Sequence, residues 1–318
     1  MQVFSGAKQV QGLGGPSVVA LGNFDGLHLG HQALIRRVLD LAKAEGLKSV
    51  VYTFDPHPVT VLHPEKNHQN LFTRQDLVEQ LTWLGVENLI LEPFTHAFAK
   101  LSPNEFLRQY LIEPLHPRHL VIGQDFAFGN QRQGSIDLLR EQSIGGGFQV
   151  QVIKPVLVEQ ALVSSSRIRL ALAAGDVVLA RKLLGRPFAS HGVVITGAGR
   201  GRTIGVPTAN MQIHDTLLPK RGVYLTKAWV NGLAHPAVTN VGIAPTFNGE
   251  NAPLWLETHI LDQNLGLVGS RLRLEFISYL REEKRFSAVE ELVQQIARDI
   301  QKARELWDLN DEMGRSRP

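Results

Sequence analysis

The stretch VVALGNFDGLHLGHQALIRRVL, residues 18–39, decides the fold of the first half of the chain. Its first four residues are apolar and predict a buried strand, and its last eight have the apolar spacing of a helix. Three glycines between these segments allow the backbone to approach a ligand closely. His28 and His31 lie on one face of the first helical turn, where backbone N–H groups and the positive end of the helix dipole also point. This junction is therefore predicted to bind phosphate.

Composition limits the class of protein. The 318 residues are 43% hydrophobic and 20% charged, which is typical of one large or two ordinary globular domains. No apolar run reaches the roughly 18–20 residues of a membrane helix, and no secretory signal is visible, so we expect a cytoplasmic protein with no membrane partner. The absence of cysteine excludes disulfides, thiolate metal sites and a cysteine nucleophile. A net charge of +3, with no strongly basic half, does not favour a nucleic-acid partner.

Strands and helices alternate in the first half. Strands followed by helices form βαβ units, so the pattern predicts a Rossmann-like α/β domain with a parallel sheet. In such sheets ligands bind at the carboxyl ends of the strands, where residues 22–31 are expected. The expected strands are 18–21, 49–54, 88–91, 119–122 and 149–158, and the expected helices are 31–44, 74–84, 103–112 and 136–142.

The second half has a different pattern. Residues 164–184 predict two short helices, and residues 186–280 contain β-rich runs separated by Gly, Pro and Asn. The runs predict a small antiparallel barrel or sandwich. Residues 287–307 predict a long amphipathic C-terminal helix that covers it, followed by a polar, frayed tail. We place the domain boundary at residue 185, giving domains 1–185 and 186–318.

The glycine–histidine motif fits some nucleotide sites better than others. It lacks the G-x-G-x-x-G spacing of dinucleotide-binding folds and the G-K-[ST] of a P-loop. Two histidines with Asp25 could hold a metal, but the glycines favour an anion. The motif resembles G-x-F-D-x-x-H-x-G-H of the nucleotidyltransferase superfamily related to class I aminoacyl-tRNA synthetases. The resemblance implies that His28 and His31 stabilise phosphate charge during attack at the α-phosphorus. The ATP site would also include Gly22, Phe24, Asp25 and Gly30.

The segment VSSSRIR, residues 163–169, resembles the I-S-S-T-x-I-R motif of the same superfamily. The resemblance implies that Ser165, Ser166 and Arg169 bind the ATP phosphates, with Arg169 at the β- and γ-phosphates. Arg167, the other arginine of the motif, is given no specific contact. Serines before a helix can also be simple caps. Two arginines at a helix start oppose its dipole unless an anion binds there.

Two further segments resemble bacterial FAD synthetases. They are GQDFAFGNQRQG, residues 123–134, and TFDPHP, residues 53–58. The resemblance implies a flavin site at Asp125, Phe126, Phe128 and Arg132. Aromatic rings can stack on a flat ligand, but each phenylalanine could equally be a core residue.

The segment GAGRGRTIGVPTAN, residues 197–210, resembles the riboflavin kinase signature G-x-x-x-G-x-P-T-A-N. The oxygens of Thr208 and Asn210 suit Mg²⁺. The block LETHILD, residues 256–262, resembles the family's E-x-H-x-x-D block, which implies that Glu257 is the base. A departure occurs at residues 267–269, where LVG replaces the family's frequent L-Y-G. The glycine-rich segment is expected to bind ATP phosphates through Gly197, Gly199, Arg202 and Gly205.

The order of these motifs resembles that of bifunctional bacterial riboflavin kinase/FAD synthetases, or FMN adenylyltransferases. The resemblance implies two ATP reactions that use Mg²⁺: riboflavin to FMN in the second domain, then FMN to FAD with pyrophosphate release in the first. A flavin-binding regulator with degenerate sites and a tRNA-acting protein are alternatives. The expected partners are the small molecules ATP, riboflavin and FMN, and the sequence leaves the oligomeric state open.

Overall fold

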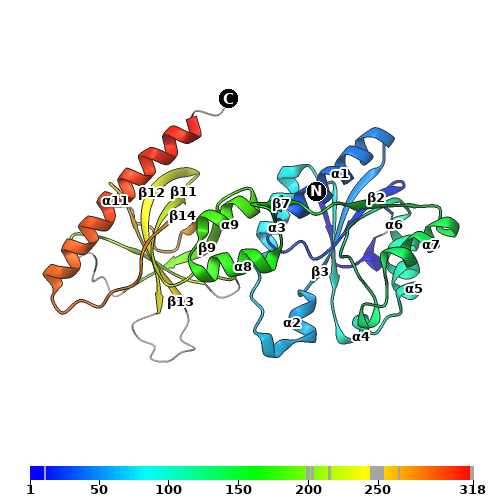
Figure 1. Ribbon diagram of the computed structural model, residues 1–318, viewed down its shortest axis with the longest axis horizontal. Coiled ribbons are helices and arrows are strands. Elements are labelled where there is room, and N and C mark those ends of the chain that lie inside the picture. The colour runs from blue at the N-terminus through cyan, green and yellow to red at the C-terminus, as the bar shows by residue number, and fades with distance from the viewer. Residues whose placement is uncertain are drawn as a thin grey trace. The chain divides into compact units, whose positions relative to one another are not determined.

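The computed structural model describes residues 1–10, 12–197, 201, 204–213, 216–243, 254–263 and 266–315 (Figure 1). The chain divides into two compact units, Met1–Ser165 and Ser166–Pro318. No helix in the described ranges is both long and apolar enough to cross a membrane.

A six-stranded parallel sheet forms the centre of the first unit, as predicted. Every residue of its central strand β2 is buried, which explains the continuous apolar run in the sequence. The order β1-β4-β3-β2-β5-β6 means that the chain moves from β2 outward to β4 and then returns to the other side of β2. The strands are β1 (Gln2–Phe4), β2 (Ser17–Leu21), β3 (Lys48–Asp55), β4 (Asn88–Pro93), β5 (Pro117–Gly123) and β6 (Gln149–Ile153).

Helices cover both faces of this sheet. Alternate residues of β2 enter different cores: Val18 and Ala20 pack with side chains of α1 and α3, whereas Val19 and Leu21 pack with Leu139 of α7. The result is a three-layer α/β unit (Figure 1). Its helices are α1 (Leu29–Glu45), α2 (Pro58–Leu62), α3 (Arg74–Leu84), α4 (His96–Ala99), α5 (Pro103–Phe106), α6 (Glu113–Leu115) and α7 (Ile136–Gly146), with short turns η1 (Ala7–Gln9), η2 (Pro64–Lys66), η3 (Leu107–Ile112, a π-helix) and η4 (Asn130–Arg132).

Two expected elements of this unit differ from the structure. The helix expected at 103–112 changes from α to π geometry at Leu107. The strand expected at 149–158 ends at Ile153, shortly before Pro155, because proline has no backbone N–H for a strand ladder. Its last residues form β7 (Leu157–Val158), which pairs with β8 (Ala161–Leu162).

The second unit contains a closed antiparallel barrel, which decides between the two predicted β architectures. Its interior is partly polar: the hydroxyls of Thr226 and Thr239 are 2.7 Å apart, and those of Thr239 and Thr258 are 3.0 Å apart. These buried hydroxyls therefore satisfy one another. The barrel order is β10 (Ala209–Gln212), β13 (Leu254–Ile260), β12 (Leu233–Ile243), β11 (Gly222–Val230), β14 (Arg271–Arg281) and β9 (Phe188–Ile195).

Three helices belong to the same unit as the barrel. The helices α8 (Ser165–Ala174) and α9 (Val177–Leu184) are the two short helices that the sequence predicted. The C-terminal helix α11 (Val289–Arg315) packs on the barrel through Ile300, Ala303 and Leu306. It continues into the tail that was expected to fray from residue 308.

Candidate active sites

Three of the sequence motifs meet at the carboxyl edge of the parallel sheet. Leu21 at the end of β2 pairs with Tyr52 of β3, and Ala20 pairs with Val121 of β5. The motif segments at the carboxyl ends of these strands, residues 22–31, 53–58 and 123–134, therefore lie at neighbouring positions of the sheet. The chain reverses its direction of growth between β2 and β5, and such a switch point is where α/β sheets bind ligands.

His28 and His31 lie at the start of α1 with their rings stacked. The ring centroids are 3.6 Å apart, at an interplanar angle of 18°. The Nδ1 atom of His28 accepts a hydrogen bond of 3.3 Å from the backbone N–H of His31, so His28 caps the helix. The buried Nδ1 of His31 has no hydrogen-bond partner among the residues that the structure describes. The pair therefore lies at the end of the helix where anions bind.

The backbone before the histidines has an unusual conformation. Phe24, Gly26 and Leu27 all have positive φ angles, of 49°, 80° and 42°. The fully buried ring of Phe24 lies 5.2 Å from that of His31, so it supports the pair from within the core. A Cβ atom on Gly30 would lie 3.0 Å from the His28 ring. Gly22 follows β2 directly. The ATP contacts expected of Gly22, Phe24 and Gly30 stay predictions.

The His31 imidazole has a pKa well below its usual 6.5, because protein surrounds the ring and His28 lies beside it. The unfolded chain therefore binds this proton more tightly, and stability falls as pH decreases below about 6.5. We expect the His31 ring resonances to show no NMR inflection at or above pH 6.5. His31→Gln should remove this part of the pH dependence of unfolding. An inflection at or above pH 6.5 in the folded protein would contradict the prediction.

Asp25 anchors a neighbouring loop. Its carboxylate accepts a 2.8 Å hydrogen bond from the backbone N–H of Leu71, and its carbonyl accepts one of 2.9 Å from the Ser165 hydroxyl. A cavity adjoins Asp25 and is also lined by Thr53 and Asn70. The buried side-chain oxygen of Asn70 lacks a hydrogen-bond partner within the described ranges. Asn70 was not among the predicted site residues, because no motif contains it.

The glycine-rich segment after β5 combines core and surface residues. Phe128 is 7% exposed and packs against Phe106, with ring centroids 5.7 Å apart. Phe126 stacks on Phe128 at 5.6 Å. Asp125 and Arg132, by contrast, are exposed. Phe128 is thus a core residue, one of the two roles considered for the phenylalanines. The flavin contacts expected of Asp125, Phe126, Phe128 and Arg132 stay predictions.

Gly134 allows the Phe128 ring to pack. A Cβ atom at this position would lie 2.7 Å from the ring carbons. We expect Gly134→Ala to destabilise the first unit by about 1–3 kcal/mol, as overpacking does. Hydrogen exchange in β5 and α7 should then be roughly 5- to 150-fold faster.

Gly145→Ala provides the matched control, because a Cβ atom there meets nothing within 4 Å. Alanine also has a higher helix propensity than glycine, and position 145 lies within α7. Equal exchange rates in the Gly134 variant and the wild type would show that the Phe128 packing is not required.

The second phosphate motif lies at the start of α8. Ser165 is the last residue of the first compact unit, whereas Ser166, Arg167 and Arg169 belong to the second. Ser166 is exposed, and Arg169 is half-buried on the first turns of the helix. Their expected roles at the ATP phosphates stay predictions.

On the barrel, strand register brings three polar side chains into one row. Glu257 of β13 lies opposite Asn210 of β10 on one side and opposite Asn240 of β12 on the other. Directly opposed residues project from the same face of a sheet. Leu256 and Thr258, the neighbours of Glu257, are buried and point to the barrel interior, so the row lies on the outer face. Asn240 was missed as a site residue because its sequence neighbours do not reveal this register.

The glycine-rich segment before β10 packs closely on this row. A Cβ atom on Gly197 would lie 2.1 Å from the side-chain nitrogen of Asn210. Gly201 accepts a 2.8 Å hydrogen bond from the backbone N–H of Val206, which folds the segment back on itself. Gly205 has a φ of 79°. Gly199 and Arg202, also expected to bind phosphate, lie outside the described residues.

Two cavities share one residue, Thr208. The first cavity is lined by Glu257, Asn240 and apolar residues of α11. The second is lined by Gly197, Gly201 and Asn210. Thr208 lines both, so it lies where a group could pass from a ligand in one cavity to a ligand in the other.

Hydrogen bonds hold Asn210 and the backbone beside Thr208 in place. The Asn210 side-chain oxygen accepts a 2.9 Å bond from the Trp255 indole N–H. The ring Nδ1 of His259 is 2.9 Å from the carbonyl oxygen of Pro207, next to Thr208. In the described parts of the chain, no group of three or more His, Cys, Asp or Glu residues could hold a metal. The Thr208 and Asn210 oxygens instead fit Mg²⁺, which commonly takes few protein ligands and completes its shell with phosphate and water.

In comparisons with known proteins, the two parts of the chain match two different families. The family model described as FAD synthetase matches residues 12–167, and the one described as riboflavin kinase matches residues 184–307. The bifunctional riboflavin kinase/FMN adenylyltransferase of Bacillus subtilis is 40% identical over 291 residues, 90% of this chain and 91% of that protein. The Escherichia coli K12 protein of the same name is 35% identical over 92% of this chain and 93% of its own length.

A solved structure is also similar over both units. The crystal structure titled a macrolide-efflux protein from Streptococcus pneumoniae has a TM-score of 0.86 and 33% identity, covering 95% of this chain and 98% of that chain. The family models, the curated relatives and this structure agree over both halves of the chain. The chain belongs to the family of bifunctional riboflavin kinase/FMN adenylyltransferases.

Proposed function

We propose that the outer face of the barrel catalyses riboflavin phosphorylation at the junction of its two cavities. The observation that carries the proposal is the position of Thr208, which lines both the cavity that contains Glu257 and the cavity at the glycine-rich segment. An alcohol bound beside Glu257 and a nucleotide bound at the glycines would meet at Thr208. The flavin is a substrate and product here, so the site has no redox role.

Glu257 acts as the general base in this proposal. Its carboxylate takes the proton from the 5′-hydroxyl of the ribityl chain, the hydroxyl oxygen attacks the γ-phosphorus of ATP, and ADP leaves. Thr208 and Asn210 would hold Mg²⁺. When bound, the ion neutralises charge on the phosphates. Glycines 197 and 201 leave room for this arrangement, because a side chain at either position would collide with Asn210 or with the Val206 carbonyl.

The sheet unit carries out the second reaction, adenylylation of FMN. The phosphate of FMN attacks the α-phosphorus of ATP, and pyrophosphate leaves. A phosphate is already nucleophilic, so the site requires hydrogen-bond donors more than a base. The depressed pKa of His31 keeps its ring neutral near pH 7, with one N–H to donate. The start of α1 contributes backbone N–H groups and the helix dipole.

Three further expectations complete the proposal. The catalytic domains are 1–185 and 186–318, both reactions use Mg²⁺, and the protein acts in the cytoplasm. The residues assigned to phosphate and flavin binding take the roles that the motifs imply.

Product analysis tests the function directly. The purified chain is incubated with riboflavin, ATP and Mg²⁺, and flavins are separated by chromatography. We expect FMN and then FAD to accumulate, and neither to form when a chelator removes the metal. Riboflavin binding without turnover would instead support a flavin-binding regulator.

A further inference from the structure

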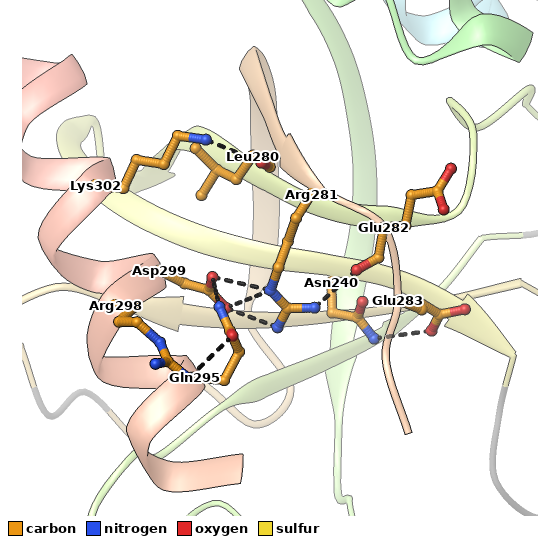
Figure 2. A network of polar contacts seen from close by, with 9 residues as sticks. All are labelled: Asn240, Leu280, Arg281, Glu282, Glu283, Gln295, Arg298, Asp299 and Lys302. Atoms are coloured by element: carbon orange, nitrogen blue, oxygen red, sulfur yellow. Dashed lines mark hydrogen bonds and ion pairs between the residues drawn. The ribbon is translucent and has the colours of Figure 1, made fainter. Parts of the chain in front are cut away.

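We propose that Arg281 and Asp299 form a clamp that positions helix α11 as one wall of the riboflavin cavity. Arg281 lies at the end of β14 and Asp299 on α11 (Figure 2). The guanidinium Nε lies 2.9 Å from both carboxylate oxygens, and Nη2 lies 2.7 Å from Oδ2. This proposal rests on the assignment of the cavity beside Glu257 to riboflavin.

The clamp lies where α11 changes its surroundings. On its C-terminal side, Ala303 is fully buried, and Ile300 and Leu306 pack in a core with residues of the barrel strands. On its N-terminal side, Leu292 and Ile296 line the cavity. Ile300, Arg281 and Asp299 lie at the point of change and line the cavity as well. The helix is therefore anchored on the barrel up to the clamp, and beyond it the helix forms a wall of the cavity.

The wall has the chemistry that a flavin ring requires. Leu292, Ile296 and Ile300 are spaced to share one face of α11, and they line the same cavity as Val223 and Val238 of the barrel. A flat, largely apolar ring fits between such surfaces, while the ribityl chain extends to Glu257 in the same cavity. The spacing between helix and barrel then sets how well the ring is held, so a small shift of α11 weakens binding.

Neighbouring hydrogen bonds hold the clamp in its geometry. The Gln295 amide donates a 2.9 Å bond to Oδ1 of Asp299, and Nη1 of Arg281 donates one of 2.8 Å to the Glu282 carbonyl. One turn further along α11, the Lys302 ammonium donates a 3.0 Å bond to the Leu280 carbonyl (Figure 2). The clamp side chains are only 16% and 7% exposed. Solvent therefore screens this pair much less than it screens a surface ion pair.

A second ion pair of α11 provides a matched control. The Nη2 atom of Arg304 lies 2.6 Å from Oδ1 of Asp262. These side chains are 49% and 69% exposed, and neither is among the residues that line the cavity. Exposed pairs contribute little. Arg304→Gln removes this pair from the helix side and should therefore leave the kinase constants unchanged.

The test is a double-mutant cycle of Arg281→Met, Asp299→Leu and the double variant. We expect each single variant to raise the KM for riboflavin by about tenfold or more, with a smaller change in KM for ATP. Riboflavin affinity measured by fluorescence quenching without ATP should fall in parallel. FAD formation from supplied FMN in the same proteins should be unchanged. The KM of the double variant for riboflavin should not exceed that of the more impaired single variant, because both substitutions remove the same interaction.

Other outcomes overturn the proposal. Unchanged riboflavin KM in folded single variants would show that the clamp does not position the wall. Losses that multiply in the double variant would mean that each side chain contacts the flavin independently. If a single variant fails to fold, the double variant, which leaves no buried charge unpaired, provides the same test. Absence of FMN formation by the wild type would instead contradict the assigned function.

Discussion

Glu257→Gln is expected to lower the kcat of FMN formation by about two to four orders of magnitude, the usual contribution of a general base. Glutamine keeps the shape of the side chain and its place between Asn210 and Asn240, but it cannot accept the hydroxyl proton. The KM for riboflavin should change little. The measurement is the initial rate of FMN and ADP formation from riboflavin and ATP.

A nearby carboxylate serves as the control for this experiment. The side chain of Glu282 is 72% exposed and pairs with Lys220 at 2.8 Å, outside the cavity beside Glu257. Glu282→Gln should therefore keep the wild-type rate. A Glu257→Gln protein that folds and retains that rate would contradict the role of Glu257 as base.

Replacing both His28 and His31 with alanine is expected to lower FAD formation from FMN by at least about 10²- to 10³-fold, the effect of losing one oxyanion donor. The stacked rings lie together at the start of α1, so either could partly replace the other in a single variant. Pyrophosphate release with FMN and ATP measures the loss. FMN formation from riboflavin should continue at the wild-type rate.

His63→Ala is the matched control in the same unit. Its side chain is 50% exposed and contacts Glu65 rather than the motif. This variant should make FAD normally. If the double histidine variant also made FAD at the wild-type rate, adenylyl transfer would not depend on the motif.

The sequence predicted the sheet unit well because its central strands are buried on both faces. The apolar run at β2 and the helical spacing after His31 are local signals, and together they place the motif at the carboxyl edge. The three-residue strand β1 has no such signal, because it depends on pairing with β4, far along the chain. The contact of Asp25 with Leu71 likewise depends on tertiary structure.

The barrel site shows the same limit. The PTAN and Glu257 motifs were visible in the sequence, but the position of Asn240 beside Glu257 depends on the register of β12 and β13. Strand β10 has no clear signal of its own, because four residues are too few for a clear alternation. The clamp between Arg281 and Asp299 joins a strand end to a helix that the sequence showed only as amphipathic.

The central claim is that two separate sites carry out successive reactions. It is tested most directly by giving the Glu257→Gln protein and the His28→Ala/His31→Ala protein riboflavin or FMN, each with ATP and Mg²⁺, and separating the products by chromatography. The account predicts a crossed pattern: the first variant makes FAD from FMN but almost no FMN from riboflavin, and the second makes FMN but almost no FAD. Loss of both reactions in either folded variant would contradict it.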